Sequence, residues 1–311
     1  MLIYVIKRLL AGVPTLLISF TLVFFIAHAT PGSPWDASSN RPIEPAVKAR
    51  LDEKYNLNAP LYVQYVSYLS GAVRGDFGPS FRDRTMNVSD IVAQFLPVSL
   101  KLGGAAMLLA VLLGLPLGAL AALSRKPIVD GAVRVISTVG ISMPTYVVTS
   151  ILIVSLGVGL GWVPTFGWEG FFSISSIVPI VSLALAPLGA VIRSFRTSLL
   201  EVMNLDFIKT ARAKGLKPMS IIIHHMSRNA LVPTVTVVGA YASSILVGSF
   251  FVESIAGIPG FGRYLVLAVA ARDYPVIIAT TLIYAMLVIV INILVDLIYF
   301  LLDPQVRLES A

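Results

Sequence analysis

The sequence LGGAAMLLAVLLGLPLGALAALS, from Leu102 to Ser124, is 23 residues long and contains no Asp, Glu, Lys or Arg. A helix that crosses the hydrocarbon core of a membrane needs about 20 mostly apolar residues, at about 1.5 Å of rise per residue. Inside lipid the backbone must satisfy its own hydrogen bonds, and an α-helix does so within one segment. This stretch therefore predicts a membrane-spanning helix.

The rest of the chain repeats this pattern. The whole chain of 311 residues is 57% hydrophobic and 13% charged, whereas a soluble domain has about 25% charged residues. It contains no cysteine, which excludes a disulfide scaffold and thiolate metal or redox sites. The sequence predicts an all-α, polytopic membrane protein with six transmembrane helices. Five further stretches of at least 22 residues lack charged side chains: Leu9–Trp35, Val135–Trp168, Gly170–Ile192, Asn229–Val252 and Tyr274–Val295.

Lysine and arginine residues indicate the orientation, because short cytoplasmic loops carry an excess of both. The short loops 160–175 and 253–275 have only Arg263 and Arg272 as basic residues. Both termini are therefore predicted to be cytoplasmic. This topology accounts for the net charge of +7, so nucleic-acid binding is not implied. The alternating set of segments holds 13 basic and five acidic residues, and consists of 1–8, 124–134, 193–228 and 303–311.

The same boundaries divide the chain into parts. Within the outer loop, the run Tyr55–Val73 is charge-free but contains several polar residues, so we predict a loop followed by an amphipathic helix that lies on the membrane or on a partner. The glycine-rich stretch Gly257–Gly262 predicts a re-entrant turn in the outer loop 253–275. The expected parts are an N-terminal tail and first helix in 1–29, an extracytoplasmic loop with short helices in 30–96, a core of five membrane helices in 97–302, and a cytoplasmic tail in 303–311.

Several catalytic and nucleotide-binding motifs are absent from the sequence. It has no G-x-x-x-x-G-K-[ST] phosphate loop, no H-E-x-x-H pair and no G-x-S-x-G elbow. We therefore expect a chain that is not an enzyme and binds no cofactor itself. Ionisable groups in the spans are confined to His28, Lys101 and Asp296, close to span ends. This weighs against a secondary transporter, which usually places such groups at midplane depth.

The cytoplasmic segment Arg193–Arg228 is the most informative loop. It has 36 residues, whereas helix connections in bundles usually have about 2–8. Asp206 can cap a short helix, Gly215 suits the left-handed position after that helix, and Pro218 suits the first turn of a second helix. We predict two short helices in an L-shaped elbow. The elbow either contacts a cytoplasmic partner or is a solvated basic elbow that serves only topology.

The predicted elbow combines apolar and basic residues. Phe207, Ala211 and Leu216 are predicted to form an apolar face, next to the charges of Lys209, Arg212, Lys214 and Lys217. The sequence DFIKTARAKGL, from Asp206 to Leu216, together with RNALVP, from Arg228 to Pro233, resembles the EAA-type loop of ABC importer permeases. It is most similar to the oligopeptide and dipeptide branch. The Glu-Ala-Ala positions would fall on Lys209, Thr210 and Ala211, so only the last alanine and Gly215 match the generic motif.

Further motifs extend the resemblance over nearly the whole chain. The chain resembles the B-type permease subunit of oligopeptide ABC importers, which implies type I ABC importer permease architecture in the bacterial inner membrane. Permeases for dipeptides, for nickel or for another small solute look alike, so these cargoes stay open as alternatives. A more remote alternative is a secondary transporter that works without ATPase subunits. The motifs are ATPGSPW (Ala29–Trp35), GDFGPSF (Gly75–Phe81), FLPVSLKLG (Phe95–Gly103), ESIAGIPGFGRYLVLAVAARDYP (Glu253–Pro275) and DLIYFLLDP (Asp296–Pro304).

The resemblance also implies partners. These are a homologous second permease forming a heterodimer, two cytoplasmic ABC ATPase subunits that bind ATP and Mg, and an extracytoplasmic substrate-binding protein. On this resemblance the cargo would be a peptide, and the elbow would fit a cleft of the ATPase. Ala211, Ala213, Gly215 and Leu216 would form the buried centre of that contact, with Arg212 and Lys214 at its rim.

The residues assigned by this comparison fall into three groups. The predicted ATPase-coupling residues are Asp206, Phe207, Lys209, Ala211, Arg212, Ala213, Lys214, Gly215 and Leu216. The end of the loop is marked by Arg228, Asn229 and Pro233. The predicted docking surface for the binding protein is carried by the aromatic residues Trp35, Tyr62, Tyr65, Phe77 and Phe81.

Overall fold

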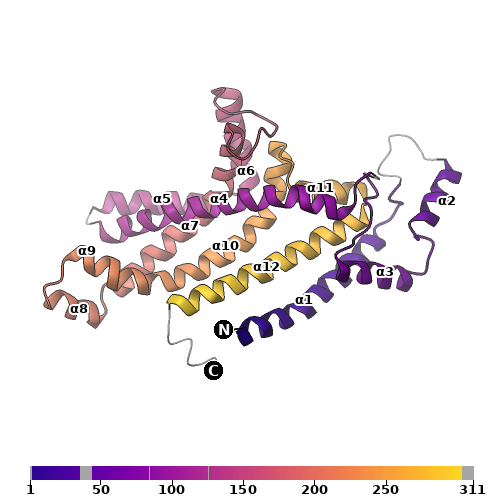
Figure 1. Ribbon diagram of the computed structural model, residues 1–311. Coiled ribbons are helices and arrows are strands. Elements are labelled where there is room, and N and C mark those ends of the chain that lie inside the picture. The colour runs from indigo at the N-terminus through magenta and orange to yellow at the C-terminus, as the bar shows by residue number, and fades with distance from the viewer. Residues whose placement is uncertain (1, 36–43, 84, 125, 303–311) are drawn as a thin grey trace. The chain divides into compact units, whose positions relative to one another are not determined.

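The structure, a computed structural model, describes residues 2–35, 44–83, 85–124 and 126–302 (Figure 1). Within these ranges the chain is built from helices and has no named strand, only an isolated bridge between Pro79 and Asn87. The all-α prediction is confirmed. The predicted cytoplasmic tail, 303–311, lies outside the described residues, as do residues 36–43 of the predicted outer loop.

The chain divides into two compact units. The first contains Met1–Ser99 and Pro259–Ile289, and the second contains Leu100–Ile258 and Val290–Ala311. The helices of the first unit are α1 (Leu2–Ala29), α2 (Pro45–Lys54), α3 (Leu61–Arg74), the first part of α4 (Val88–Leu123), α11 (Phe261–Ala271) and the first part of α12 (Tyr274–Leu302).

Helix α3 covers one side of α1 in the first unit. Phe20 and Phe24 of α1 are almost fully buried, and Tyr65 and Tyr68 of α3 pack against them. The ring centroids of Phe24 and Tyr65 are 5.3 Å apart and the rings are perpendicular, a favourable arrangement for aromatic pairs. Burial also raises the pKa of the Tyr68 phenol above its usual value. The helix predicted within Tyr55–Val73 is present as α3 and packs on the chain's own first helix. Its predicted contact with the membrane or a partner stays a prediction.

The second unit is centred on α7 (Ile177–Val202), which packs against α5 and α10. Most of one face of α7 is buried, including Leu183, Val191 and Leu199. The other helices of this unit are the second part of α4, α5 (Pro127–Ser142), α6 (Thr145–Leu152), the π-helical η1 (Ile153–Gly159), η2 (Ile174–Ser176), α8 (Asp206–Ala213), α9 (Pro218–Ser220), the π-helical η3 (Ile221–Met226), α10 (Ser227–Ala256) and the second part of α12.

Glycines allow α4 and α5 to approach α7 closely. A Cβ atom added at Gly118 of α4 would lie 2.9 Å from the carbonyl oxygen of Ile192. A Cβ atom added at Gly140 of α5 would lie 2.6 Å from the carbonyl oxygen of Leu185. Small residues at helix contacts let backbones come together and gain packing energy inside a membrane.

Five helices within the described residues are long and apolar enough to cross a membrane, and two bent or broken helix pairs raise the number to seven if each pair is one span. One broken pair is Pro127–Ser142 with Thr145–Gly159. The predicted total of six lies between these values and stays a prediction, as do the cytoplasmic termini. The five unbroken candidates are Tyr4–Ala29, Val88–Leu123, Ile174–Val202, Pro218–Leu246 and Tyr274–Tyr299.

The charge-free run Val135–Trp168 does not form one continuous helix, in contrast to the sequence-based expectation. Helix α5 stops at Ser142, and α6 leaves at an angle of 106°. Met143 has extended dihedral angles, φ −88° and ψ 126°. This is the geometry favoured for a residue that precedes proline, here Pro144, because the proline ring crowds a helical residue before it.

Candidate functional site

The elbow predicted from the sequence is formed by the end of α7, by α8 and by α9. Figure 1 shows α8 and α9 together at the ends of α7 and α10. Helix α8 begins at Asp206, but the N-cap residue is Leu205 and no side chain caps the helix. The prediction that Asp206 is the cap is therefore wrong. Its carboxylate instead lies in the first turn, where the negative charge interacts favourably with the positive end of the helix dipole. The carboxylate accepts a hydrogen bond from Lys209 Nζ at 2.8 Å.

One face of α8 is buried within the second unit. Ile208 is 0% exposed and Ala211 is 5% exposed, and both pack against Leu199, Ile221 and Met226. Ala211 therefore belongs to the chain's own core, which corrects the prediction that it lies in the centre of a partner contact. Ile208 was not singled out from the sequence, although its i, i+3 spacing from Ala211 places both on one helix face.

The corner between the two arms depends on Gly215. Its φ is +73°, in the left-handed region that glycine adopts without a Cβ penalty. The amide of Gly215 donates to the carbonyl oxygen of Arg212 at 2.9 Å, and the amide of Leu216 donates to that of Ala211 at 3.4 Å. Pro218 then occupies the first turn of α9, as predicted.

The second arm of the elbow is continuous with a long membrane helix. From Pro218 the chain remains helical through α9, η3 and α10 to Ala256. The helix that was expected to begin the fifth span near Asn229 therefore begins within the elbow. The turns of η3 are π-helical, and Ser227 Oγ donates to the carbonyl oxygen of Ile222 at 2.9 Å. Short π-helical segments in long helices often lie at functional sites.

The predicted end-of-loop residues lie early in α10. Arg228 and Asn229 are exposed in its first turn. The Asn229 side-chain amide donates to the carbonyl oxygen of His225 at 3.0 Å. Pro233 lies inside α10 without breaking it.

The outer face of the elbow is partly apolar and strongly basic. Phe207 is 42% exposed, Leu216 40% and Met219 66%. Met219 was not among the coupling residues predicted from the sequence, because its exposure depends on the direction that the chain takes after the corner at Gly215. Ala213 and Gly215 are also exposed. The four exposed basic side chains around these residues are Lys209, Arg212, Lys214 and Lys217. Such a face suits an apolar groove with an acidic rim.

The aromatic residues predicted to dock the binding protein differ in how far their side chains are buried. Trp35 is 0% exposed and Phe81 is 3% exposed; both belong to a core cluster with Tyr274. The Trp35 indole N–H donates to Asp52 Oδ1 at 2.7 Å. These two rings cannot reach a partner, because the chain's own residues cover them. The prediction that they form the docking surface is corrected accordingly.

The other three docking candidates are more accessible. Tyr62 is 73% exposed, whereas Phe77 is half-buried. Tyr65 is half-buried against α1, where its hydroxyl lies 2.9 Å from Thr21 Oγ1. Docking of a binding protein at these rings stays a prediction. Across the described ranges, no group of three or more His, Cys, Asp or Glu side chains is placed to hold a metal ion.

Two family models match the sequence. The model for the binding-protein-dependent transport system inner membrane component matches residues 114–308. The model for the N-terminal part of a binding-protein-dependent transport system membrane component matches residues 1–103.

Relatives match the chain over its whole length. It is 40% identical over 307 residues to the oligopeptide transport system permease protein OppB of Haemophilus influenzae, covering 99% of this chain and 100% of the relative. It is 41% identical to the dipeptide transport system permease protein DppB of Bacillus subtilis, covering 99% and 98%. A solved structure of the MetNI methionine ABC transporter in inward-facing conformations matches 68% of this chain and 96% of that chain, with a TM-score of 0.56 and 20% identity. At that identity the likeness supports the fold alone.

Proposed function

The chain belongs to the family of binding-protein-dependent transport system inner membrane components, and on this premise we propose that it is the permease subunit of an ATP-driven importer of oligopeptides. The family resemblance found in the sequence is thereby confirmed. The chain is a multi-pass inner membrane protein and, like its relatives, a permease and not an enzyme. The observation that carries the proposed function is the full-length identity of 39–41% to oligopeptide and dipeptide permeases. Dipeptides, nickel and another small solute remain the alternative cargoes.

The proposed assembly has five subunits. This chain pairs with a homologous second permease, two cytoplasmic ATPases supply ATP hydrolysis, and an extracytoplasmic binding protein delivers peptide. ATP binding draws the two ATPases together and moves the elbows that they hold. The permeases then tilt from an inward-facing to an outward-facing state. Such a switch requires two states that differ by a few kcal/mol and that ATP and the loaded binding protein stabilise differently.

The elbow is the proposed contact with an ATPase. The apolar side chains of Phe207, Leu216 and Met219 would enter the ATPase cleft, since they are exposed and adjacent to the corner. Ile208 and Ala211 would transmit motion, because they fasten α8 to α7 and to η3. Arg212 and Lys214 would orient the contact from its rim.

The proposed function is tested by reconstituting the chain with its partner subunits in proteoliposomes. We expect uptake of oligopeptides that requires ATP on the side of the membrane where the ATPases lie. It should also require the binding protein on the opposite side. Competition with dipeptides and with nickel ions ranks the alternative cargoes. Uptake that proceeds without ATPase subunits would support a secondary transporter and contradict the proposal.

The charge on the elbow has its own expected effect. Arg212 is exposed in the last turn of α8, and Arg212→Glu should weaken ATPase association about tenfold at low salt, with less difference at high salt, because salt screens exposed charges within a Debye length of about 8–10 Å. Binding of purified ATPase to the permease complex in nanodiscs measures this. Lys126→Glu is the matched control, since Lys126 is exposed on another predicted cytoplasmic segment. If the affinity for the ATPase changes neither with Arg212→Glu nor with salt, Arg212 makes no electrostatic contribution to the contact.

A further inference from the structure

His28 lies near the end of α1, and its side chain has no role in the function described so far. Its ring centroid is 4.1 Å from that of Phe24 in α1 and 4.7 Å from that of Tyr274 at the start of α12. It also contacts Gln64 of α3, and all four residues belong to the first unit. His28 is half-buried and precedes the segment 30–96, which is predicted to be extracytoplasmic. Its ring can therefore exchange protons with the solution on that side.

Both ring nitrogens of His28 face hydrogen-bond acceptors. Nδ1 lies 2.8 Å from the carbonyl oxygen of Phe24, which can only accept. Nε2 lies 3.2 Å from Oε1 of Gln64, the oxygen of the side-chain amide. A neutral histidine carries a proton on one ring nitrogen, so it would donate to one of these oxygens and point a lone pair at the other.

The orientation of the Gln64 amide is fixed by its own partners. Gln64 Nε2 donates to the carbonyl oxygen of Leu57 at 3.0 Å and to that of Ala59 at 2.8 Å. If the amide were flipped, Oε1 would face these two carbonyl oxygens, and both would lose their donor. Gln64 is 6% exposed, so such a loss would be costly. Oε1 therefore faces His28, and only the imidazolium, with an N–H on each nitrogen, donates to both acceptors.

The aromatic rings next to His28 also favour a positive charge on it. The planes of Phe24 and Tyr274 are tilted by 31° and 38° to the imidazole plane, and a cation is attracted to the face of an aromatic ring. Half-burial opposes the charge only in part, because water still reaches the ring. Within the described ranges, His28 forms no ion pair with a carboxylate.

The titratable groups that face His28 are two phenols. They belong to Tyr68, whose ring centroid is 6.4 Å away, and to Tyr274. Burial raises the pKa of the Tyr68 phenol, so this group stays neutral while an imidazole titrates. Asp273 acts electrostatically on Tyr68, and Arg272 acts on Tyr274.

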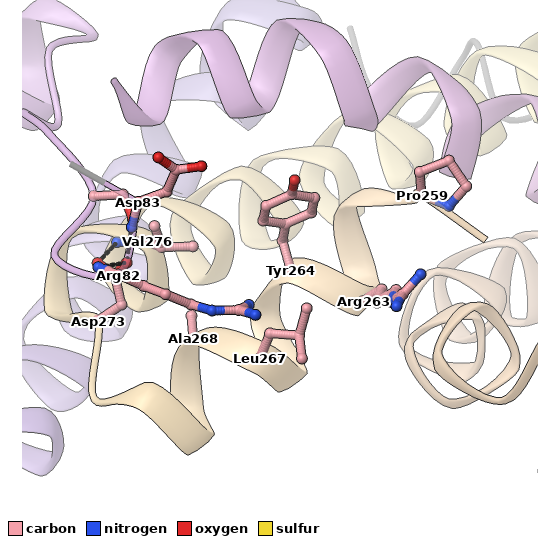
Figure 2. Close-up of a pocket in the computed structure, with 10 residues that line it drawn as sticks. Arg82, Asp83, Pro259, Arg263, Tyr264, Leu267, Ala268, Asp273 and Val276 are labelled. Carbon is pink, nitrogen blue, oxygen red and sulfur yellow. Dashed lines mark hydrogen bonds between the residues drawn. The ribbon is translucent and has the colours of Figure 1, made fainter. Parts of the chain in front are cut away.

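Asp273 is engaged elsewhere. Its side chain is 1% exposed, and its carboxylate accepts hydrogen bonds from Ser80 Oγ and from the Arg82 amide, the latter at 3.1 Å (Figure 2). These bonds fix the backbone next to Tyr274 and involve neither nitrogen of His28. The contact that depends on the charge of His28 is therefore the one with Gln64 of α3.

We propose that His28 is a pH-sensitive tie between α1 and α3, in which the imidazolium holds Gln64 and the neutral imidazole releases it. The protonated ring is the form that the folded contacts bind, so the tie is present at low pH and is lost as the outer pH rises. Helix α3 carries Tyr62 and Tyr65, two of the predicted docking residues. Loosening of α3 should therefore lower uptake, and this consequence, unlike the tie itself, rests on the proposed function.

The tie is tested directly by solid-state NMR of the full chain in lipid bilayers, with isotope-labelled histidine. The chain has three histidines, His28, His224 and His225, and replacing each by glutamine in turn assigns their ring-nitrogen signals. His224 is exposed and serves as the internal reference. As the pH is raised, His28 should keep protons on both nitrogens after His224 has lost one of them.

The effect on transport is measured in proteoliposomes that contain the complete importer, with the binding protein outside and ATP inside. The outer solution is set to about pH 6 or about pH 8, the range in which imidazole titrates, and the lumen is kept constant. The ratio of uptake at the lower pH to uptake at the higher pH should fall about tenfold in His28→Gln, the order expected for a hydrogen bond to a charged group. His224→Gln is the matched control and should keep the wild-type ratio. Any pH dependence of the binding protein is common to all variants and cancels.

Two results overturn the inference. One is loss of the second proton from His28 at the same pH as from His224, or at a lower pH. The other is a wild-type uptake ratio in His28→Gln. If His28→Gln carries no peptide at either pH, the nitrogen signals of the wild type decide. A wild-type importer that carries no peptide at either pH refutes the proposed function, whereas the nitrogen signals still test the tie.

Discussion

Replacing Gly215 by proline should lower ATP-driven peptide uptake about tenfold or more, because a proline that the backbone cannot accommodate costs roughly 3 kcal/mol. The φ of Gly215 is +73°, whereas the proline ring fixes φ near −65°. Proline also removes the N–H that donates to the carbonyl oxygen of Arg212 at 2.9 Å. The corner between α8 and α9 would open, and the proposed ATPase contact would lose its shape. Uptake and stimulated ATP hydrolysis in proteoliposomes measure this effect.

Gly215→Asn provides the matched control for this experiment. A Cβ atom added at Gly215 meets no heavy atom within 4 Å, so the site has room for a side chain. Asparagine tolerates the left-handed region better than other non-glycine residues do. We expect Gly215→Asn to retain most of the uptake. Wild-type uptake with Gly215→Pro would show that the corner does not couple the ATPases to transport.

Removing the buried face of α8 should have the second large effect. Ile208→Ala should lower the free energy of unfolding by about 2–5 kcal/mol, the usual range for a fully buried side chain of this size. Ile208 is 0% exposed and packs with Leu199, Ile221 and Met226. The elbow would therefore detach from α7 and η3. Thermal unfolding of the purified complex should begin at a lower temperature, and ATPase association should weaken with it.

Phe207→Ala separates this structural effect from the contact itself. Phe207 is the neighbour of Ile208 in the chain but is 42% exposed on the outer face. Its removal should leave the unfolding temperature unchanged and weaken ATPase binding. If Phe207→Ala binds ATPase with wild-type affinity at wild-type stability, the outer face of α8 is not the contact surface.

The charge-free runs predict where the membrane helices lie but not where they end. Helix α4 begins at Val88, well before the run that starts at Leu102, and the α10 helix is continuous back to Pro218 instead of beginning near Asn229. Lys101 and Arg228 end the charge-free runs, yet the helices continue through both residues, whose side chains are exposed. The positions of charged residues therefore do not predict where a helix ends.

Prolines illustrate a second limit of the sequence. Pro14, Pro187 and Pro233 lie inside unbroken helices, whereas Pro144 separates α5 from α6. The local chemistry is the same in all four cases, because each proline lacks an N–H and crowds the preceding turn. The surrounding contacts decide whether the helix bends or stops. Such contacts are formed by residues distant in the sequence, so the sequence alone does not reveal the break.

The elbow shows which parts of a site are local. Gly215 and Pro218 were predicted in their observed roles, because dihedral preferences belong to the residue itself. The orientation of Ala211 was not, since the chain offers Leu199 and Met226 as partners that cover it. Trp35 shows the same limit. From the sequence, an aromatic residue in a predicted long outer loop is expected to be exposed, and only the structure shows that Trp35 packs with Phe81 and Tyr274.

The continuity of the helix from Pro218 to Ala256 has a mechanical consequence. At about 1.5 Å per residue it extends over roughly 55 Å, well beyond the hydrocarbon thickness of about 30 Å. An α-helix resists axial compression, so a push on its first turn reaches its far end with little loss. A displacement of the elbow would therefore be carried along one continuous helix to Ala256, through the π-helical turns of η3 and past Pro233.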